Sequence, residues 1–515
     1  MPSTPEWFIA QLRADIQALG AQGGILTPSV YDTAQVLRDA PPEDPRPAVE
    51  WLMRQQRPDG GWGSELMPLA RHVPTLAAVL ALRGTSDTQE SRKAVEGGIE
   101  FFRRTAEAWA FDGPLPDDIP VAAELILPRL LEEAAAVGIE LPQKPFLSLS
   151  ALGTRRRGLI ARMKHRAGTA PIHSFEAWGT EPDMNVLDGS KGVGNSPAAT
   201  AHWLRLRRAT VPPGTRELPA EVLGAEEFLR AAAEATGTGL PGVVPTVWPI
   251  VHYEQSWSLL ALFSTGLLDH PGLRDVVRPQ LEGLYRAVRP EGYGMSEFFV
   301  CDGDITSTCL AMLKETGHAV DGGLLQRYQL ADGQFITYAH EMQPSVTTTA
   351  HGVMALAILG QDVSRQVRWL AEKRGADGLW RMDKWHASWL YSTSQVMLAL
   401  CRAGATDVVR PAVEALLRSQ HAEGGWGMAR TPSLLETAYA VHALRALRNH
   451  GLFGPEVKRA LQRAAGWMGA QKDVAPERQE MLWTGKELYR PFRLDRIFER
   501  SAMLALELDR DSLAE

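Results

Sequence analysis

Apolar and small residues in the second half of the chain recur with the period of an α-helix. In the segment "ETAYAVHALRAL", Ala440, Ala443, Leu444 and Leu447 fall on one helical face. The segments "TAHGVMALAIL" and "STSQVMLALC" are similarly rich in small and apolar residues. No stretch shows the sustained alternation that is typical of a β-strand. The pattern predicts an all-α protein built from paired helices.

Turn signals separate these helical stretches at regular intervals. The segments "RPEGYG", "LADGQF", "GADGLW" and "HAEGGWG" contain Gly292, Gly333, Gly378 and Gly424, separated by 41, 45 and 46 residues. A repeat of this length accommodates two helices and their turns, and Asp-Gly or Glu-Gly supplies the positive φ of a tight turn. Related turns occur around residues 60 and 189 at longer intervals. The repeat predicts helix pairs that close into α/α barrels.

Composition narrows the class of protein and of partner. The 515 residues are 45% hydrophobic and carry a net charge of −7, which favours two domains and argues against nucleic acid or anionic lipid as a partner. Three cysteines without metal-ligand spacing are typical of a reducing compartment. With an amphipathic, acid-containing N-terminus and no apolar run near ~18 residues, we expect a cytoplasmic protein without a transmembrane segment, either a monomer or a homodimer.

Two carboxylates in "CDGDITST" are the strongest candidates for chemistry. Asp302 and Asp304 flank a glycine and are followed by hydroxyl-bearing and apolar residues. Two carboxylates in one apolar pocket do not both ionise, so one of them stays protonated and becomes a proton donor. The alternative is structural, because Asp304 followed by "ITST" and an apolar stretch is also a start signal for a helix.

The same segment resembles the Asp-rich "DxDD-T" motif of class II terpene cyclases. Other segments resemble further motifs of that family, in the family's order, from residue 29 to about residue 395. They are "SVYDTAQV", "AVEWLMRQQRPDGGWG", "IPVAAELILPRLLEEA", "IHSFEAW", "DGSKGVGNSPAATAHWL", "VPTVWPIVHYEQSW", "PSVTTTAHGVMAL" and "DKWHASWLYSTSQ", with a weaker "LWTGKELYRP" near the end.

The resemblance implies two α/α-barrel domains of the βγ type, with a cavity between them that holds a linear prenyl diphosphate. Residues 1–22 form a helix that joins the second barrel, residues 23–245 form an inserted barrel, and residues 246–515 form the barrel that carries the Asp-rich motif. The chain lacks the "DDxxD" metal motif of diphosphate-ionising enzymes. The diphosphate is therefore expected to remain in the product.

The resemblance also assigns roles around the acid. Asp304 matches the general acid that protonates the terminal alkene, and Asp302 matches the neighbour that braces it. Ile305 stands where the family usually has a further Asp, so the hydroxyls of Thr306 and Ser307 are candidates to compensate.

A second departure lies on the next predicted helix. Thr349 replaces the usual Asn, and either Thr349 or His351 is the expected hydrogen-bond partner of the acid. For His351 the alternative is an ordinary core histidine.

Other positions are expected to terminate the reaction and to bind the substrate. His173 matches a histidine that takes part in the final deprotonation, but Pro241 stands at the position of its Asn partner. Lys384 and Lys486 match basic residues that bind the diphosphate. In the inserted barrel, the family has acidic residues that bind Mg²⁺ with the diphosphate. Glu124 matches one of these positions, and Asp117 and Asp118 precede it as further candidates; surface or capping roles are the alternative for all three.

Aromatic residues are expected to stabilise the cationic intermediates with their ring faces, although such positions also fill ordinary cores. The candidates are Trp248, Tyr253, Trp257, Phe298, Phe299, Trp385, Trp389, Tyr391 and Tyr489.

The sequence thus predicts an enzyme that cyclises a linear prenyl diphosphate to a bicyclic diphosphate by protonation. Geranylgeranyl diphosphate is the favoured substrate, with a copalyl- or halimadienyl-type product, and farnesyl diphosphate with a drimenyl-type product is second. A squalene-type triterpene cyclase and a non-catalytic α/α-barrel binding protein are the alternatives.

Overall fold

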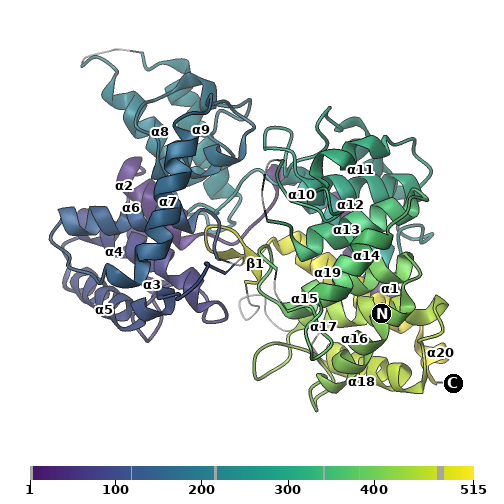
Figure 1. Cartoon of the computed structure of the whole chain (residues 1–515). Coiled ribbons are helices and arrows are strands. Elements are labelled where there is room, and N and C mark those ends of the chain that lie inside the picture. Colours follow the sequence, from purple (N-terminus) through teal and green to yellow (C-terminus); the bar gives the residue numbers. More distant parts are fainter. Residues whose placement is uncertain are drawn as a thin grey trace.

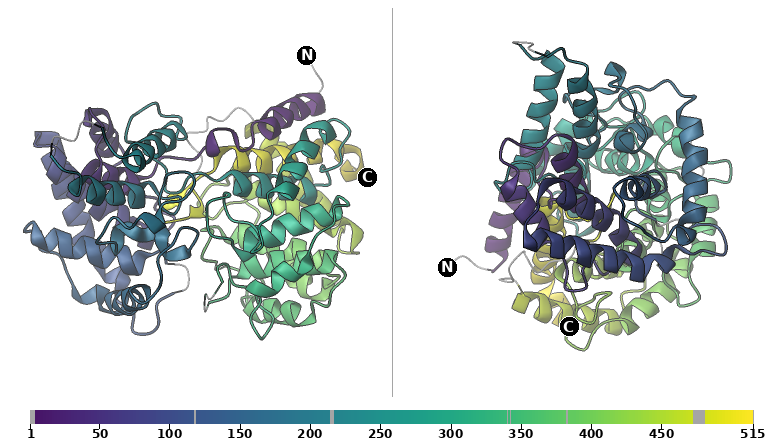
Figure 2. Two further views of the ribbon diagram at one scale, coloured as in Figure 1. Left: turned by 90° about the horizontal axis from the view of Figure 1, so that it is seen from above. Right: turned by 90° about the vertical axis from the view of Figure 1, so that its left-hand side faces the viewer.

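The chain folds into two helical lobes placed side by side (Figures 1 and 2). The computed structural model describes residues 4–116, 119–213, 217–339, 341, 343–381, 383–471 and 481–514. Helices make up nearly all of the regular structure, as the sequence predicts. In the described ranges, no helix is both long and apolar enough to cross a membrane.

The lobe formed by the second half of the chain is an α/α barrel, called here the C-terminal barrel. Six inner helices contact one another in a closed ring: α10 (Val251–Ser264), α12 (Gly303–Glu315), α13 (Val346–Ile358), α15 (Trp389–Arg402), α17 (Leu434–Ala446) and α19 (Phe492–Leu508). Outside the ring lie α1 (Thr4–Gln17), α11 (Arg274–Arg286), α14 (Ser364–Lys373), α16 (Thr406–Arg418), α18 (Pro455–Gln471) and the short α20 (Arg510–Ala514).

The two layers of this barrel differ in the pattern of their residues. In the inner helix α12, every residue from Gly303 to Leu313 is buried, whereas the outer α14 buries only Gln366 and Leu370. A helix with apolar and small residues all round belongs inside a core, and an amphipathic one covers it. The N-terminal helix α1 is such an outer helix, and its Phe8, Leu12 and Ile16 belong to the core of the C-terminal barrel.

The other lobe, called here the inserted barrel, is smaller and closes with a segment of 3-10 helix. Its inner ring runs through α2 (Val30–Asp39), α4 (His72–Thr85), α6 (Ala123–Ala136), η5 (Ala170–Ala177) and α8 (Pro197–Ala209). Its outer helices are α3 (Arg46–Arg54), α5 (Gln89–Thr105), α7 (Leu147–Ile160) and α9 (Ala220–Glu234). Two hydrophobic cores within residues 30–244 fill it.

Short elements complete the structure. They are η1 (Ala21–Gly23), η2 (Pro68–Arg71), η3 (Ala106–Trp109), η4 (Lys144–Phe146), η6 (Met184–Val186), η7 (Gly322–Tyr328), η8 (Leu447–Asn449), β1 (Trp483–Thr484) and β2 (Leu488–Tyr489). The strands β1 and β2 pair antiparallel as a hairpin. Figure 2 shows this yellow hairpin between the two lobes, and the Val121 N–H of the inserted barrel donates to the Gly485 carbonyl within it, at 2.9 Å.

The glycine turns have the predicted conformation and a shared architecture. The φ angles at Gly292, Gly333, Gly378 and Gly424 lie between +93° and +110°. At Gly424, an added Cβ would stand 2.6 Å from the Arg463 carbonyl oxygen. After two of these turns a buried tryptophan indole donates to the carbonyl ten residues earlier, Trp380 to Leu370 at 2.7 Å and Trp426 to Leu416 at 2.8 Å. The prediction of tight turns with a positive φ at these glycines is confirmed.

Candidate active site

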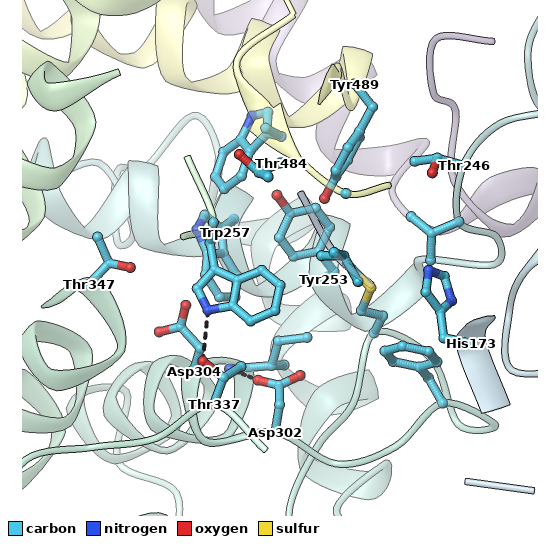
Figure 3. Close-up of a pocket in the computed structure, with 18 of the residues that line it drawn as sticks. His173, Thr246, Tyr253, Trp257, Asp302, Asp304, Thr337, Thr347, Thr484 and Tyr489 are labelled. Carbon is cyan, nitrogen blue, oxygen red and sulfur yellow. Dashed lines mark hydrogen bonds between the residues drawn. The ribbon is translucent and has the colours of Figure 1, made fainter. Parts of the chain in front are cut away.

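A cavity lined by residues of both barrels contains the predicted acidic pair. The space between its lining atoms, part of which is open to solvent, is about 710 Å³. Figure 3 shows Asp302 and Asp304 on one side of it and His173 with Thr246 on another. The lining residues are Val121, His173, Thr246, Val247, Tyr253, Trp257, Met295, Phe299, Asp302, Asp304, Ile305, Thr337, Tyr338, Thr347, Trp385, Tyr391, Trp483, Thr484, Gly485 and Tyr489.

The first turn of helix α12 positions the two carboxylates. Asp302, in extended conformation, caps the helix, and its Oδ1 accepts from the Ile305 N–H at 2.7 Å. The alternative role considered from the sequence, that of a helix cap, therefore belongs to Asp302. The prediction that Asp304 is the cap is wrong. Asp304 lies inside the first turn, so its side chain is free to contact the neighbouring helix. Ile305 lines the cavity with an apolar surface at the position of the missing carboxylate.

Burial controls the protonation of Asp302. Its side chain is in the protein interior, and this burial, together with the negative charge of Asp304, raises the pKa of Asp302 well above its usual range, against the hydrogen bond from Ile305. Burial therefore favours the neutral form of Asp302.

Asp304 is paired with a histidine from the adjacent inner helix α13. The Nδ1 atom of His351 lies 2.5 Å from Oδ1 of Asp304, and the ring is fully buried. Burial alone would lower the pKa of His351, but the charge and hydrogen bond of Asp304 more than offset it, so this pKa is raised. The edge-to-face contact with Trp257, with centroids 5.5 Å apart, fixes the ring further.

The predicted hydroxyl partners of the acid have structural roles instead. The Thr349 Oγ1 accepts from the Phe335 N–H at 3.0 Å and donates to the Ser345 carbonyl at 2.7 Å. Thr306 accepts in the same way from the Tyr293 N–H at 2.9 Å. Thr393 and Thr437 make the equivalent bond to the turns of their own repeats. These threonines tie each turn to an inner helix, and His351 is the partner of Asp304.

Ser307 also bonds within its own helix. Its hydroxyl donates to the Gly303 carbonyl at 2.6 Å. Neither the Thr306 hydroxyl nor the Ser307 hydroxyl therefore replaces the missing third carboxylate.

Several predicted aromatic residues line the cavity and others lie behind it. Phe299, Trp385, Tyr391 and Tyr489 line it, together with Tyr253 and Trp257. The remaining three do not belong to the lining: the Trp248 indole donates to the Gln22 carbonyl at 2.8 Å, Phe298 packs against Gly189, and Trp389 lies beneath Arg381.

His173 reaches the cavity from the inserted barrel. Its Nδ1 lies 2.8 Å from the Gly194 carbonyl, which only accepts hydrogen bonds, so Nδ1 carries the proton and Nε2 is left as an acceptor. Burial and the charge of Lys486 lower the pKa of His173 to about 3. The neighbouring Thr246 hydroxyl, also in the lining, is buried without a partner in the part of the chain that the structure describes.

The two predicted diphosphate lysines are placed differently. Lys486 is fully buried, and its ammonium lies 2.6 Å from Glu176 Oε1 and 2.6 Å from Ser196 Oγ. It ties the hairpin to the inserted barrel and does not belong to the lining. Lys384 lies beside the lining residue Trp385, with its ammonium 2.5 Å from Glu341 Oε1.

The predicted magnesium ligands do not form a site within the described residues. Glu124 is buried and pairs with Arg156 at 2.5 Å. Asp117 and Asp118 lie outside the described residues. Across the described ranges, no group of three or more His, Cys, Asp or Glu side chains is arranged to hold a metal ion.

Some residues of the site were not predicted. Thr337, Tyr338 and Met295 line the cavity from loops that connect the helices, and Trp483 does so from the hairpin. Gln395 lies behind the acid, with Oε1 3.1 Å from His351 Nε2. It is the last residue of the segment "DKWHASWLYSTSQ", and the resemblance of that segment to a motif of class II terpene cyclases is the signal that could have marked it.

Known proteins resemble this chain along nearly its whole length, although no protein-family model matches it. It is 42% identical to (+)-kolavenyl diphosphate synthase of Herpetosiphon aurantiacus, over 97% of this chain and 98% of that protein. It is 32% identical to ent-copalyl diphosphate synthase of a Streptomyces species, over 92% and 91%. The solved structure of ent-copalyl diphosphate synthase from Streptomyces platensis matches it with a TM-score of 0.80 and 27% identity, over 98% of this chain and 100% of that chain. The chain therefore belongs to the class II terpene cyclases.

Proposed function

We propose that this enzyme converts geranylgeranyl diphosphate to a bicyclic diphosphate by protonating its terminal alkene, with the diphosphate retained. The observation that carries the proposal is the buried Asp304–His351 pair at the wall of an aromatic-lined cavity. The relatives named as kolavenyl and copalyl diphosphate synthases support a diphosphate substrate over squalene.

The first step is proton transfer from Asp304. An alkene is a very weak base, so its protonation requires a neutral, preorganised acid in a pocket that excludes water. Oδ1 of Asp304 is held by His351, which leaves Oδ2 to carry the proton. The O–H bond breaks, a C–H bond forms at the terminal alkene, and the π electrons of the chain close the rings. Burial favours the neutral form of Asp302, which adds no second negative charge beside the new carboxylate.

The aromatic lining then stabilises the cation while it moves through the rings. The faces of Trp257, Trp385 and Tyr391 supply negative potential without a nucleophile that would trap the cation.

The last step removes a proton from carbon. Nε2 of His173 accepts it, since Nδ1 already donates to Gly194 and the ring is neutral. A ring nitrogen of low basicity suffices because the carbocation is a very strong acid. One proton enters and one leaves, so the product is an isomer of the substrate, and solvent restores both side chains.

Magnesium belongs to this proposal as a counter-ion of the diphosphate. Glu124 is engaged by Arg156, and the described acidic residues form no metal cluster. No step of the reaction is therefore assigned to the metal. Lys384, beside Trp385 at the cavity wall, is the lysine placed best to contact the diphosphate.

To test the proposal, purified enzyme is incubated with Mg²⁺ and one candidate substrate in each reaction: geranylgeranyl diphosphate, farnesyl diphosphate or squalene. Products are treated with phosphatase and identified by mass spectrometry. We expect a bicyclic C20 alcohol, and faster conversion of farnesyl diphosphate would reverse the choice of substrate. Asp304→Asn should lower turnover by at least about 100-fold with unchanged circular dichroism, whereas Asp377→Asn in an exposed turn should not. Full activity of Asp304→Asn would refute the mechanism.

A further inference from the structure

Gln395 extends the acid pair into a chain of three side chains. The inner helices α12, α13 and α15 are neighbours in the ring, and they contribute Asp304, His351 and Gln395 respectively. His351 Nδ1 lies 2.5 Å from Asp304 Oδ1, and His351 Nε2 lies 3.1 Å from Gln395 Oε1. His351 is fully buried and Gln395 is 1% exposed, so water does not compete for either contact.

The two ring nitrogens of His351 thus face two oxygen atoms. In this orientation of the amide, the carbonyl oxygen of Gln395 faces Nε2 and only accepts hydrogen bonds, which favours a proton on Nε2. Neutral imidazole carries one proton, which the amide then holds on Nε2, and Nδ1 becomes the nitrogen that exchanges its proton with Asp304. A second proton on the ring, at Nδ1, is stabilised because it points at the carboxyl oxygen of Asp304.

We propose that Gln395 is a positioning residue that holds His351 as an imidazolium, so that Asp304 becomes half of an ion pair when it gives up its proton. The consequence for catalysis rests on the proposed function. Loss of the Oδ2 proton would otherwise create an isolated carboxylate in a buried site, which is strongly unfavourable. With His351 protonated, the same step creates a hydrogen-bonded carboxylate–imidazolium pair, so the carboxylate that remains after proton transfer is stabilised.

The charges around the ring agree with this assignment. Two acidic groups raise the pKa of His351: Asp383, in the segment before α15, and Asp304 on α12, whose charge acts once it has given up its proton. From α10, the ring faces the uncharged indole of Trp257. Asp383 is bound elsewhere, by the Ser345 hydroxyl at 2.7 Å and the Thr347 hydroxyl at 2.9 Å. Gln395 is therefore the side chain that contacts the second ring nitrogen.

The protonation of His351 is measured without substrate. Enzyme labelled with ¹⁵N in histidine is titrated by NMR, and the His351 signals are assigned by their loss in His351→Gln. We expect both ring nitrogens to be protonated at pH 7. Gln395→Met removes the acceptor at similar volume and should lower the titration midpoint by about one to two pH units. Gln395→Glu supplies a charged acceptor and should raise it. Gln366→Met, a buried glutamine on α14, should leave it unchanged.

The catalytic effect is tested by measuring the turnover rate of the wild-type enzyme and of the Gln395 variants as a function of pH. Activity should fall as pH rises through the His351 midpoint, and this limb should move to lower pH in Gln395→Met and to higher pH in Gln395→Glu. A neutral wild-type ring with an unprotonated Nε2 at pH 7 would overturn the inference. So would a loss of activity in Gln395→Met that is equal at every pH, because that loss would indicate packing alone. If no prenyl diphosphate is converted, the proposed function fails, and the NMR titration still decides the state of His351.

Discussion

Replacing Lys486 with methionine takes a fully buried ammonium out of the contact between the two barrels. The ammonium lies 2.6 Å from Glu176 Oε1 and 3.7 Å from Asp32 Oδ1, and both carboxylates belong to the inserted barrel. Removing one partner of a buried ion pair costs about 3–5 kcal/mol, because the remaining charges stay buried without a counter-ion. We expect the free energy of unfolding to fall by an amount of this order.

The assay is urea unfolding followed by tryptophan fluorescence, with Lys384→Met as the matched control. The Lys384–Glu341 pair is just as short, at 2.5 Å, but its side chains are 11% and 26% exposed. A partly exposed pair contributes at most about 1 kcal/mol. Lys486→Met should therefore lower the unfolding midpoint much more than Lys384→Met. Adding Glu176→Gln to Lys486→Met should restore part of the loss, since the stranded carboxylate is then removed.

One result would refute this reasoning. If Lys486→Met unfolds at the wild-type urea concentration but has a raised KM for the prenyl diphosphate, Lys486 binds substrate, as the sequence predicted, and does not tie the barrels together.

Three further predictions concern structure, pH dependence and product. Thr349→Val leaves the Phe335 N–H without its acceptor and should cost about 1–3 kcal/mol of stability with an unchanged product, and a changed product would contradict its structural role. Burial raises the pKa of Glu487 from 4.5 to about 8, so the folded state binds this proton more tightly and stability should fall by a few kcal/mol as pH rises from about 5 through 8. Glu487→Gln should flatten that dependence in urea unfolding at pH 6 to 9, and an unaltered slope would count against it. His173→Ala should divert the final cation to a hydroxylated or differently placed alkene product by mass spectrometry, whereas the wild-type product would exclude His173 as the base.

Local sequence signals predict the helices and the turns of this fold. The small and apolar face in "ETAYAVHALRAL" forms the inner helix α17, and the Asp-Gly and Glu-Gly turns have the positive φ that they require. The acidic pair was identified from a short motif, because Asp302 and Asp304 are set by the first turn of one helix. These features depend on neighbours within a few residues, which a sequence displays directly.

Contacts between distant residues limit what the same signals predict. Lys486 looks like a free basic residue in "GKELY", and its partner Glu176 is 310 positions away. Thr349 stands at a position that the family uses for the acid, but its hydroxyl is taken by the turn of its own repeat. The distance between Asp304 and His351 depends on the packing of α12 against α13, which no pattern in either segment specifies.

The closed ring of the C-terminal barrel gives the order in which the enzyme is assembled. Its last inner helix, α19, contacts α10 and also α1, whereas the inserted barrel is complete by about residue 244. During synthesis from the N-terminus, domains fold as units once their residues have emerged. We therefore expect the cores of the inserted barrel to form while α1 still lacks its partner α19, and the ring that contains α12 to stay open until α19 has been made. We therefore expect Asp304 to be enclosed only at the end of synthesis, and a chain truncated between residues 316 and 491 contains the acid without the complete ring around it.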